Sequence, residues 1–342
     1  MRDPLRAPPA AAQAAARHEP LEGLRPEWDE LLAGSQADGP FLTWEWIEAW
    51  TRHLLPGGEP GALAVRRGGR LIGVAPLMPE TRRAWGLLEV PGLKFLGTGI
   101  AGPDYLDVIA LRGLEPQVAG AVASAVAGDA GWLEMGQVRE GPAVADGVAG
   151  LLARRGWTVA GRTLNVCPYI PLEGSSWESY LADLGREHRY GIHRKLRRLD
   201  RTFAVSLRIA ASHDERRQAL RHLLDLHGKR WETRGGSDAF GGRALEDFHE
   251  EFTRRALDRG WLRLLTLSLD GMPAASLYGL SYKGIFYFYQ SGLEPRFARH
   301  STGLVIMAHA IQAALKEGAR EFDMLHGAES YKFHWARRTR AI

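Results

Sequence analysis

The chain has 342 residues, of which 45% are hydrophobic and 25% are charged, and its formal net charge is +4. This composition is ordinary for a soluble globular protein, and the length allows two domains with cores of their own. The single cysteine, Cys167, excludes a disulfide framework and a thiolate metal cluster. Because no apolar run approaches a membrane span and the N-terminus lacks the apolar core of a signal peptide, we expect a cytoplasmic protein.

The first half of the sequence predicts a lead-in followed by strands and helices. Residues 1–20 are rich in Ala, Pro and Arg, which predicts disorder. The apolar runs 62–65 and 71–75 flank the turn Arg67-Gly68-Gly69, which indicates a hairpin. The other expected elements are helices at 28–32, 43–50, 116–127 and 144–155 and strands at 93–97, 105–111 and 132–138.

The second half begins with an extended segment at 157–172. A clear amphipathic helix follows at 215–231, with Leu220, Leu223 and Leu224 on one side. Two apolar strands flank the turn Asp270-Gly271. The remaining expected elements are helices at 177–184, 245–258 and 301–316 and strands at 203–209, 261–269, 273–282, 285–292 and 321–326.

The two halves have the same order of elements, which indicates an internal repeat. This order favours two copies of one mixed α/β domain over a single large sheet, with the domains at 21–174 and 175–342. We expect the first copy to be a scaffold or the acceptor side. We expect the C-terminal tail to pack back on that first domain.

An anion site is indicated at the start of the predicted helix 301–316. Strand, loop, helix and strand form a βαβ unit here, and ligands of such units lie beyond the carboxyl ends of the strands. The helix start combines backbone N–H groups with the helix dipole and two potential cations, which suits a phosphate. An ordinary cap on a core helix is the alternative. The residues concerned are Arg299, His300, Ser301, Thr302 and Gly303.

Polar side chains gather at the ends of the two strands of this unit. Asp323 lies in an otherwise apolar strand, and an unpaired buried carboxylate is costly, so we expect it to be paired, exposed at the strand end or functional. Residues after Gly327 leave the sheet, a common place for site residues, although a plain surface loop is the alternative. The candidates are Tyr289, Gln290, Ser291, Asp323, His326, Glu329, Tyr331 and Lys332.

Three weaker candidates lie elsewhere. The basic run from Arg186 to Arg201 is either a solvated helix face or a contact for phosphates or nucleic acid. Asp104 and Tyr105 either reach the substrate or cap a strand, and Trp231 and Phe240 form either a lid over the substrate or a hydrophobic cluster. Walker, Rossmann, HExxH and GxSxG motifs are all absent from the sequence, so no metal site is expected.

A set of short strings is spread over most of 21–335. In the second half they are Ser291-Gly292, Pro295, Gly303-Leu304, Gly318, the run 322–327, Glu329, Tyr331-Lys332-Phe333 and Trp335, and upstream they are 41–50, 104–108, Leu226-His227, Arg230-Trp231 and Asp270-Gly271. These strings resemble the GNAT superfamily of N-acyltransferases, in the branch of Fem-type peptidyltransferases and CelD-like proteins of cellulose biosynthesis.

This resemblance implies two tandem GNAT-like domains, with acyl-CoA as co-substrate in the second. The pyrophosphate of the donor is then expected at 299–303, and the thioester at 289–291 against 323–325. An acyl group would pass to an amine of a small molecule or glycan precursor in cell-envelope or polysaccharide metabolism. Asp323 or Glu329 would be the base, Lys332 or the backbone at 289–291 would polarise the carbonyl, and Tyr331 would be the acid.

Two alternatives stay open within the same resemblance. The helix start departs from the usual coenzyme A loop, because Arg299 is four residues before Gly303 and Val305 replaces a small residue. Fem-type relatives take aminoacyl-tRNA, for which the run 186–201 would be the contact. A GNAT-fold accessory protein of polysaccharide biosynthesis without donor binding is the other alternative.

Overall fold

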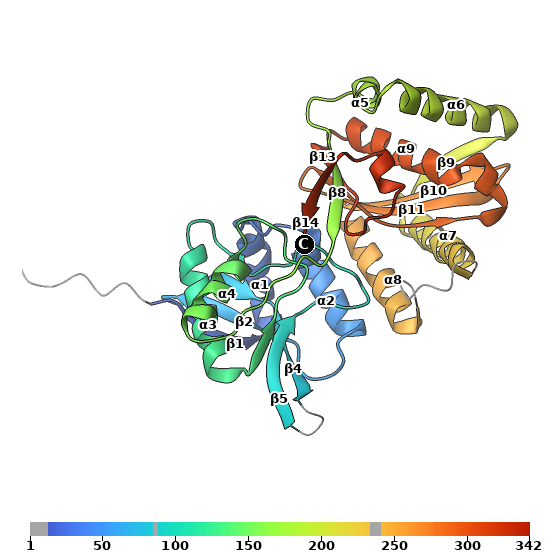
Figure 1. Ribbon diagram of the computed structural model, residues 1–342. Helices are drawn as coiled ribbons and strands as arrows, with labels where there is room; N and C mark the ends of the chain where they lie inside the picture. The colour runs from blue at the N-terminus through green and yellow to red at the C-terminus, as the bar shows by residue number, and fades with distance from the viewer. Residues whose placement is uncertain (1–12, 85–87, 233–240) are drawn as a thin grey trace, which may run out of the picture. The chain divides into compact units, whose positions relative to one another are not determined.

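The computed structural model describes residues 13–84, 88–232 and 241–342, and the chain divides into two compact units (Figure 1). The first unit contains the residues up to 162, except for two short segments, 52–54 and 100–102, that belong with the second unit. The second unit starts at residue 163. It therefore starts before the predicted boundary at 174/175, because strand β8 (Val166–Pro171) is hydrogen-bonded to strands of the second unit only.

Strand β1 (Ala15–Pro20) opens the described part of the first unit. It pairs antiparallel with β2 (Gly61–Arg67), from Ala15 opposite Arg66 to Pro20 opposite Gly61. Disorder as far as residue 20 is therefore a wrong prediction for 15–20, whereas 1–12 lie outside the described residues. The segment lacks an apolar pattern of its own, and it is held by ladder hydrogen bonds and by an ion pair of 2.8 Å between Glu19 and Arg66.

The predicted hairpin of the first unit is confirmed as β2 and β3 (Arg70–Ala75). Pro76 then separates β3 from β4 (Leu77–Ala84), and since proline has no N–H for a ladder, the sheet divides here. The two sheets have the orders β1-β2-β3-β6 and β4-β5-β7. The other elements of this unit are α1 (Leu21–Ala33), α2 (Trp44–His53), β5 (Leu88–Phe95), β6 (Ile109–Ala110), α3 (Glu115–Asp129), β7 (Trp132–Glu134) and α4 (Val144–Arg154).

The second unit is built on a seven-stranded sheet of order β14-β8-β13-β12-β11-β10-β9. Only β12 and β13 are parallel neighbours. The C-terminal strand β14 (Arg338–Ala341) pairs with β8, which lies within the predicted first domain 21–174 but belongs to the sheet of the second unit. The other strands are β9 (Val205–Ile209), β10 (Leu262–Leu269), β11 (Met272–Tyr282), β12 (Ile285–Leu293) and β13 (Glu321–Asp323).

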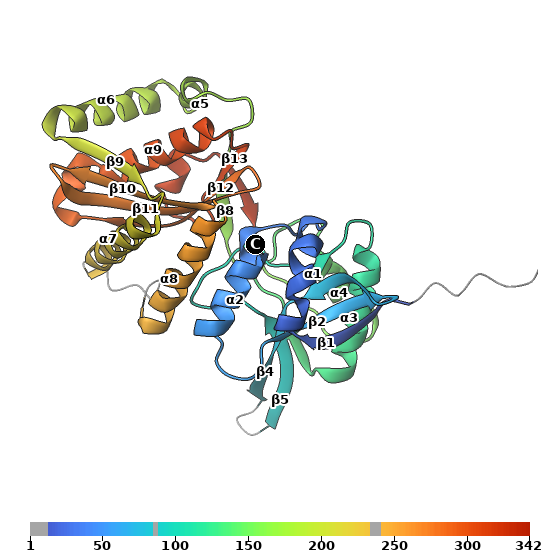
Figure 2. The same ribbon diagram turned by 180° about the vertical axis from the view of Figure 1, so that it is seen from behind.

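Helices cover both faces of this sheet, as Figures 1 and 2 show. Helix α9 (Thr302–Lys316) lies on one face, with α5 (Trp177–Asp183) and α6 (Arg186–Thr202) beyond it. Helices α7 (His213–Glu232) and α8 (Arg243–Asp258) lie on the other face. Because α9 lies between the sheet and α6, it is apolar nearly all round, and its Val305, Ile306 and Ile311 are fully buried.

The two units share one connection, which supports the predicted repeat. In each unit an antiparallel strand pair is followed by a helix and a strand parallel to the second strand of the pair: β4-β5-α3-β7 and β11-β12-α9-β13. The continuous strand β11 corresponds to β3 and β4 together, which Pro76 separates. The predicted fold class, mixed α/β with twisted sheets flanked by helices, is confirmed.

Candidate functional site

The parallel strands β12 and β13 separate in the middle of β12. They pair from Ile285 and Glu321 to Tyr287 and Asp323, and there β13 ends, although the sequence predicts a strand as far as residue 326. The carboxylate of Asp323 accepts the backbone N–H of Leu325 at 2.8 Å, and Leu325 turns the chain away with a φ of 52°. Residues 288–293 of β12 therefore continue without β13 beside them, at the place where α/β sheets bind ligands.

A β-bulge lies at this point of separation. On β12, Phe288 is opposite Gly279 and Gln290 is opposite Tyr278, so Tyr289 is the inserted residue. Bulges of this kind redirect side chains and are frequent beside active sites.

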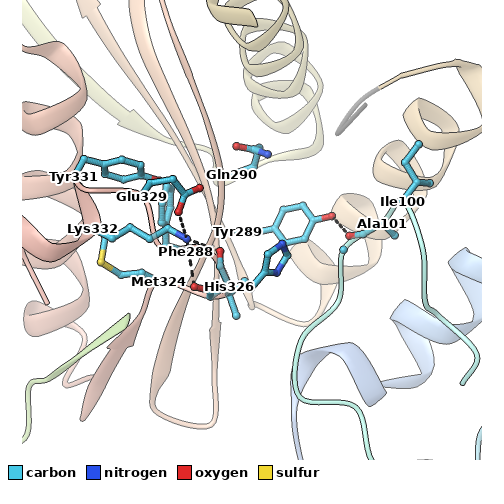
Figure 3. Close-up of a pocket in the computed structure, with 12 residues that line it drawn as sticks. Ile100, Ala101, Phe288, Tyr289, Gln290, Met324, His326, Glu329, Tyr331 and Lys332 are labelled. Atoms are coloured by element: carbon cyan, nitrogen blue, oxygen red, sulfur yellow. Dashed lines mark hydrogen bonds and ion pairs between the residues drawn. The ribbon is translucent and has the colours of Figure 1, made fainter. Parts of the chain in front are cut away.

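A pocket of about 190 Å³ lies in the opening between the two strands (Figure 3). Six of the candidates at the strand ends line it together: Tyr289, Gln290, His326, Glu329, Tyr331 and Lys332. The other lining residues are Ile100, Ala101, Gly102, Phe288, Met324 and Leu325.

Lys332 is buried, and its charge is directed at the loop below the pocket. Its ammonium donates to the carbonyl oxygens of His326 at 2.5 Å and Leu325 at 3.3 Å, and it lies 3.1 Å from the Glu329 carboxylate (Figure 3). These three contacts match the three N–H donors of a lysine. Lys332 therefore holds the loop at 325–329, and its expected role in polarising the reacting carbonyl stays a prediction.

The two carboxylates predicted as alternative bases have different surroundings. Asp323 is fully buried and lies 3.4 Å from the guanidinium of Arg340. The expectation that this carboxylate is paired is therefore confirmed. It does not line the pocket. Glu329 lines the pocket with a side chain that is 54% exposed, so a substrate can reach its carboxylate.

An aromatic cluster lies behind the pocket. The hydroxyl of Tyr289 donates to the carbonyl of Ala101 at 2.5 Å, and its ring packs against Tyr278 and His249. Burial lowers the pKa of His249 to about 3 and raises the pKa of Tyr278 well above its ordinary value. Both groups are therefore neutral at physiological pH.

Ser291 lies outside the pocket. Its N–H donates to the side-chain oxygen of Gln290 at 2.9 Å, and its carbonyl oxygen lies 3.3 Å from Nδ1 of His227 on α7. The next residue, Gly292, is where α7 comes closest, since a Cβ there would lie 2.7 Å from the backbone nitrogen of His227. This end of β12 is thus shaped by helix packing, and Ser291 helps to fix it.

The start of α9 lies beside the basic helix α6. The segment predicted as a loop is a 3-10 helix, Pro295–His300, and Ser301 then takes a left-handed conformation with a φ of 58°. A hollow of about 420 Å³ lies here. It is lined by Arg194, Lys195, Arg198 and Leu199 from α6 and by Arg299, His300 and Ser301 from the start of α9.

The charge in this hollow favours an anion. Desolvation and the neighbouring guanidinium groups of Arg299 and Arg198 lower the pKa of His300. Like charges held this close repel one another, so a bound anion would relieve the repulsion. Two features that the sequence presents separately, the basic run and the helix start, therefore meet in one place.

Four further predicted residues that the structure describes, Thr302, Gly303, Asp104 and Tyr105, line neither cavity. Thr302 is buried in the first turn of α9, and a Cβ on Gly303 would lie 3.1 Å from the Leu293 side chain, so this glycine serves packing against β12. Asp104 is fully buried and Tyr105 has a φ of 59°, and both belong to the first unit. Trp231 lies in α7 with its side chain outside the described part of the chain, and Phe240 lies outside the described residues.

Several lining residues escape sequence reasoning. Ile100, Ala101 and Gly102 come from a loop in the first half of the sequence. That loop contains the glycines 97, 99 and 102, which is a signal for a turn and not for a site. The cations 194, 195 and 198 of α6 are spaced at i, i+1 and i+4, so they lie close together on the helix surface. This spacing does not predict which other element packs against them.

Two further properties concern the described residues as a whole. Within residues 13–84, 88–232 and 241–342, no group of three His, Cys, Asp or Glu side chains is arranged to hold a metal ion. Over the same ranges, none of the helices combines the length and the apolar character that crossing a membrane requires.

Comparison with known proteins finds a family model and solved structures that resemble this chain. Residues 186–333 match the family model described as an acetyltransferase (GNAT) domain. This part of the chain is therefore similar to GNAT domains. No curated protein sequence matches the chain.

Solved structures resemble the whole chain at low sequence identity. FemX aligns over 92% of each chain with a TM-score of 0.61 and 10% identity. A conserved protein of unknown function from Bacteroides thetaiotaomicron aligns over 92% of this chain and 95% of its own, with a TM-score of 0.57 and 10% identity. The C-terminal domain of a putative lysylphosphatidylglycerol synthetase from Agrobacterium fabrum aligns over 77% and 82%, with a TM-score of 0.50 and 10% identity. These likenesses concern the fold alone.

Proposed function

We propose that the GNAT domain makes this chain an N-acyltransferase, which transfers an acyl group from acyl-CoA to an amine. One observation carries the proposal: β12 separates from β13 at the Tyr289 bulge, and this opens a pocket lined by ionisable side chains. The cationic hollow at the start of α9 supports it, since phosphate groups of a donor suit a helix start that is surrounded by arginines.

The pocket offers groups for each step of direct transfer. The amine nitrogen attacks the thioester carbonyl, the carbon–sulfur bond breaks, the amine loses a proton and the thiolate gains one. Glu329 is the proposed base, because it is the exposed carboxylate of the pocket. Tyr331 is the proposed acid for the thiolate. Backbone amides at 289–290 on the open part of β12 are the proposed donors to the carbonyl oxygen.

The chemistry of the pocket favours a positively charged acceptor in its resting state. Glu329 supplies a negative charge at the pocket surface, and the carbonyl oxygen of Ala101 and the side chain of Gln290 supply further polar groups. An ammonium group of a small molecule or glycan precursor fits such surroundings, and the carboxylate then removes its proton.

Binding and turnover test the proposal directly. Isothermal titration with coenzyme A and with acetyl-CoA measures the donor site. Release of free thiol, followed with a panel of amines and amino sugars, measures transfer. We expect micromolar to millimolar donor affinity and thiol release that depends on the amine. Absence of heat with every CoA ester would contradict the proposal.

A second donor, aminoacyl-tRNA, is favoured by the charge along α6. Two further hollows of about 400 Å³ follow this helix. They are lined by Arg186, Arg189, Tyr190, His193, Arg194, Arg197, Arg198, Arg201 and Thr202. A row of cations with an exposed tyrosine suits a phosphate backbone and a stacked base. Titration with tRNA at two salt concentrations separates the two donors, because binding to a nucleic acid falls steeply with salt.

A further inference from the structure

We infer that Arg340, on the C-terminal strand β14, is a positioning residue for the site between β12 and β13. It acts through Asp323 and the turn at Leu325 on the loop that carries Glu329 and Lys332. This inference rests on the proposed acyl transfer only for its kinetic effect, since the contacts of Arg340 can be tested without activity.

The guanidinium of Arg340 binds two carboxylates of β13 and is nearly buried. Its Nη2 lies 2.7 Å from Glu321, and its Nη1 lies 3.4 Å from Asp323. It also covers the ring of Tyr169 on β8 at 3.9 Å. The side chain is 9% exposed. A planar fork with fixed donors can contact two carboxylates and an aromatic face at once, which a lysine cannot do.

Asp323 connects Arg340 to the turn at Leu325. One oxygen of its carboxylate faces Arg340, and the other accepts the backbone N–H of Leu325 at 2.8 Å. Leu325 has a φ of 52°, a region that leucine adopts only when its surroundings impose it. Asp323 therefore holds an unfavourable backbone conformation, and Arg340 keeps Asp323 oriented.

The turn at Leu325 also positions the charged pair of the pocket, Lys332 and Glu329. The carbonyl oxygens of Leu325 and His326 both accept from the ammonium of Lys332, which lies beside Glu329. Lys332 and Glu329 line the pocket, whereas Arg340 and Asp323 do not. Arg340 thus influences the position of the proposed base from outside the pocket.

The test compares three variants of the full chain. Arg340→Met removes the cation, Arg340→Lys keeps the charge without the fork, and Arg338→Met is the matched control, because Arg338 lies on the same strand with an exposed side chain. The readouts are kcat, the dissociation constant for coenzyme A, the melting temperature and amide hydrogen exchange over 324–332.

We expect Arg340→Met to lower kcat by about a hundredfold, as small misplacements of catalytic groups do. Affinity for coenzyme A should change less than about twofold, because the hollow at α9 shares no residue with this chain of contacts. Exchange should rise at 324–332 above its rise in the rest of the sheet. In kcat and in hydrogen exchange at 324–332, Arg340→Lys should fall between Arg340→Met and wild type. In both quantities Arg338→Met should match wild type.

A rescue experiment separates positioning from general stability. Arg340→Ala leaves a space between the Tyr169 ring and two carboxylates, and guanidinium at low millimolar concentration should bind there and restore part of kcat. Urea and sodium chloride at equal concentration should have no such effect.

A uniform rise in exchange across the sheet, with kcat and donor affinity falling together, would overturn the inference. If wild type transfers no acyl group from any CoA ester, the proposed function fails instead. The exchange pattern still decides whether Arg340 holds the turn.

Discussion

The ammonium of Lys332 lies 3.1 Å from the carboxylate of Glu329, and both groups face the pocket beside the Tyr289 bulge. The pair joins a buried cation to an exposed acid. The same ammonium donates to two backbone carbonyls, so the pair is anchored to the loop and its position depends on the fold of that loop. The two members of the pair therefore have different proposed roles, and substitutions can separate them.

Lys332→Met should destabilise the protein and slow turnover while sparing donor binding. It removes charge-assisted hydrogen bonds to buried carbonyls, for which we expect a loss of about 2 kcal/mol in the free energy of unfolding. Chemical denaturation and coenzyme A titration measure the two effects. Loss of coenzyme A affinity without loss of stability would contradict the loop-holding role.

Glu329→Gln should instead leave stability nearly unchanged and remove most of the activity. The side chain is 54% exposed, so its ion pair contributes little to stability. A general base is worth about a hundredfold to ten-thousandfold in rate. Thiol release by the variant and by wild type at saturating amine measures this loss. Activity within about twofold of wild type would show that the base is another group.

Arg198→Ala and Arg299→Ala should each weaken coenzyme A binding by about tenfold to a hundredfold, the equivalent of one charge-assisted hydrogen bond. Arg189→Ala is the matched control, because Arg189 lies on α6 but lines a different hollow. All three variants should weaken tRNA binding if tRNA is the donor. Equal effects of Arg198→Ala and Arg189→Ala on coenzyme A affinity would contradict a localised phosphate site.

Local signals predict much of the second unit and of its pocket. The aromatic strand β12, the apolar helix α9 and the short strand β13 each have a clear pattern. Tyr289 within β12 and Tyr331 in the loop after β13 line one pocket. Strand ends of a βαβ unit lie together by topology, so sequence order suffices to bring them together. The charged loop after Gly327 follows for the same reason.

Contacts between distant segments could not be predicted. Asp323 is expected to need a partner, but Arg340 reaches it only because β14 pairs with β8, and this pairing has no local signal. The meeting of α6 with the start of α9 depends on how two helices pack. From the sequence, Gly303 is expected to let a phosphate approach the backbone closely. In the structure, the space beside its Cα is next to the Leu293 side chain. Gly303→Val would therefore disturb the end of β12 and is no clean probe of the donor.

Tyr278→Phe should raise stability by about 1 kcal/mol. The Tyr278 side chain is fully buried, and within the described ranges its hydroxyl has no hydrogen-bond partner. Burying an unsatisfied hydroxyl is costly, so its removal is favourable. Tyr180→Phe is the matched control, because the buried Tyr180 hydroxyl donates to the Trp335 carbonyl at 2.9 Å, and we expect a loss of about 1 kcal/mol there. Denaturant midpoints measure both changes, and a destabilised Tyr278→Phe protein would reveal a hidden partner.

Asp107 should make the stability of the first unit depend on pH. Its carboxylate accepts backbone N–H groups of Val108 at 2.7 Å, Val144 at 3.0 Å and Ala145 at 2.8 Å, and thereby caps the start of α4. Burial nevertheless raises the pKa of Asp107 from 3.8 to about 6. The folded protein therefore binds a proton more tightly than the unfolded chain. Stabilisation from this group is complete below the unfolded pKa and is lost as the pH rises through about 6.

The comparison that tests this sign is wild type against Asp107→Asn, whose amide does not titrate. We expect the free energy of unfolding of wild type, relative to the variant, to be about 1.4 kcal/mol higher near pH 5 than near pH 7, which is one pKa unit of linkage. Only the difference between the two proteins counts, because every other titrating group is common to both. A difference that is constant from pH 5 to 7 would show an unshifted carboxylate, and one that grows with pH would show that its three N–H contacts outweigh its burial.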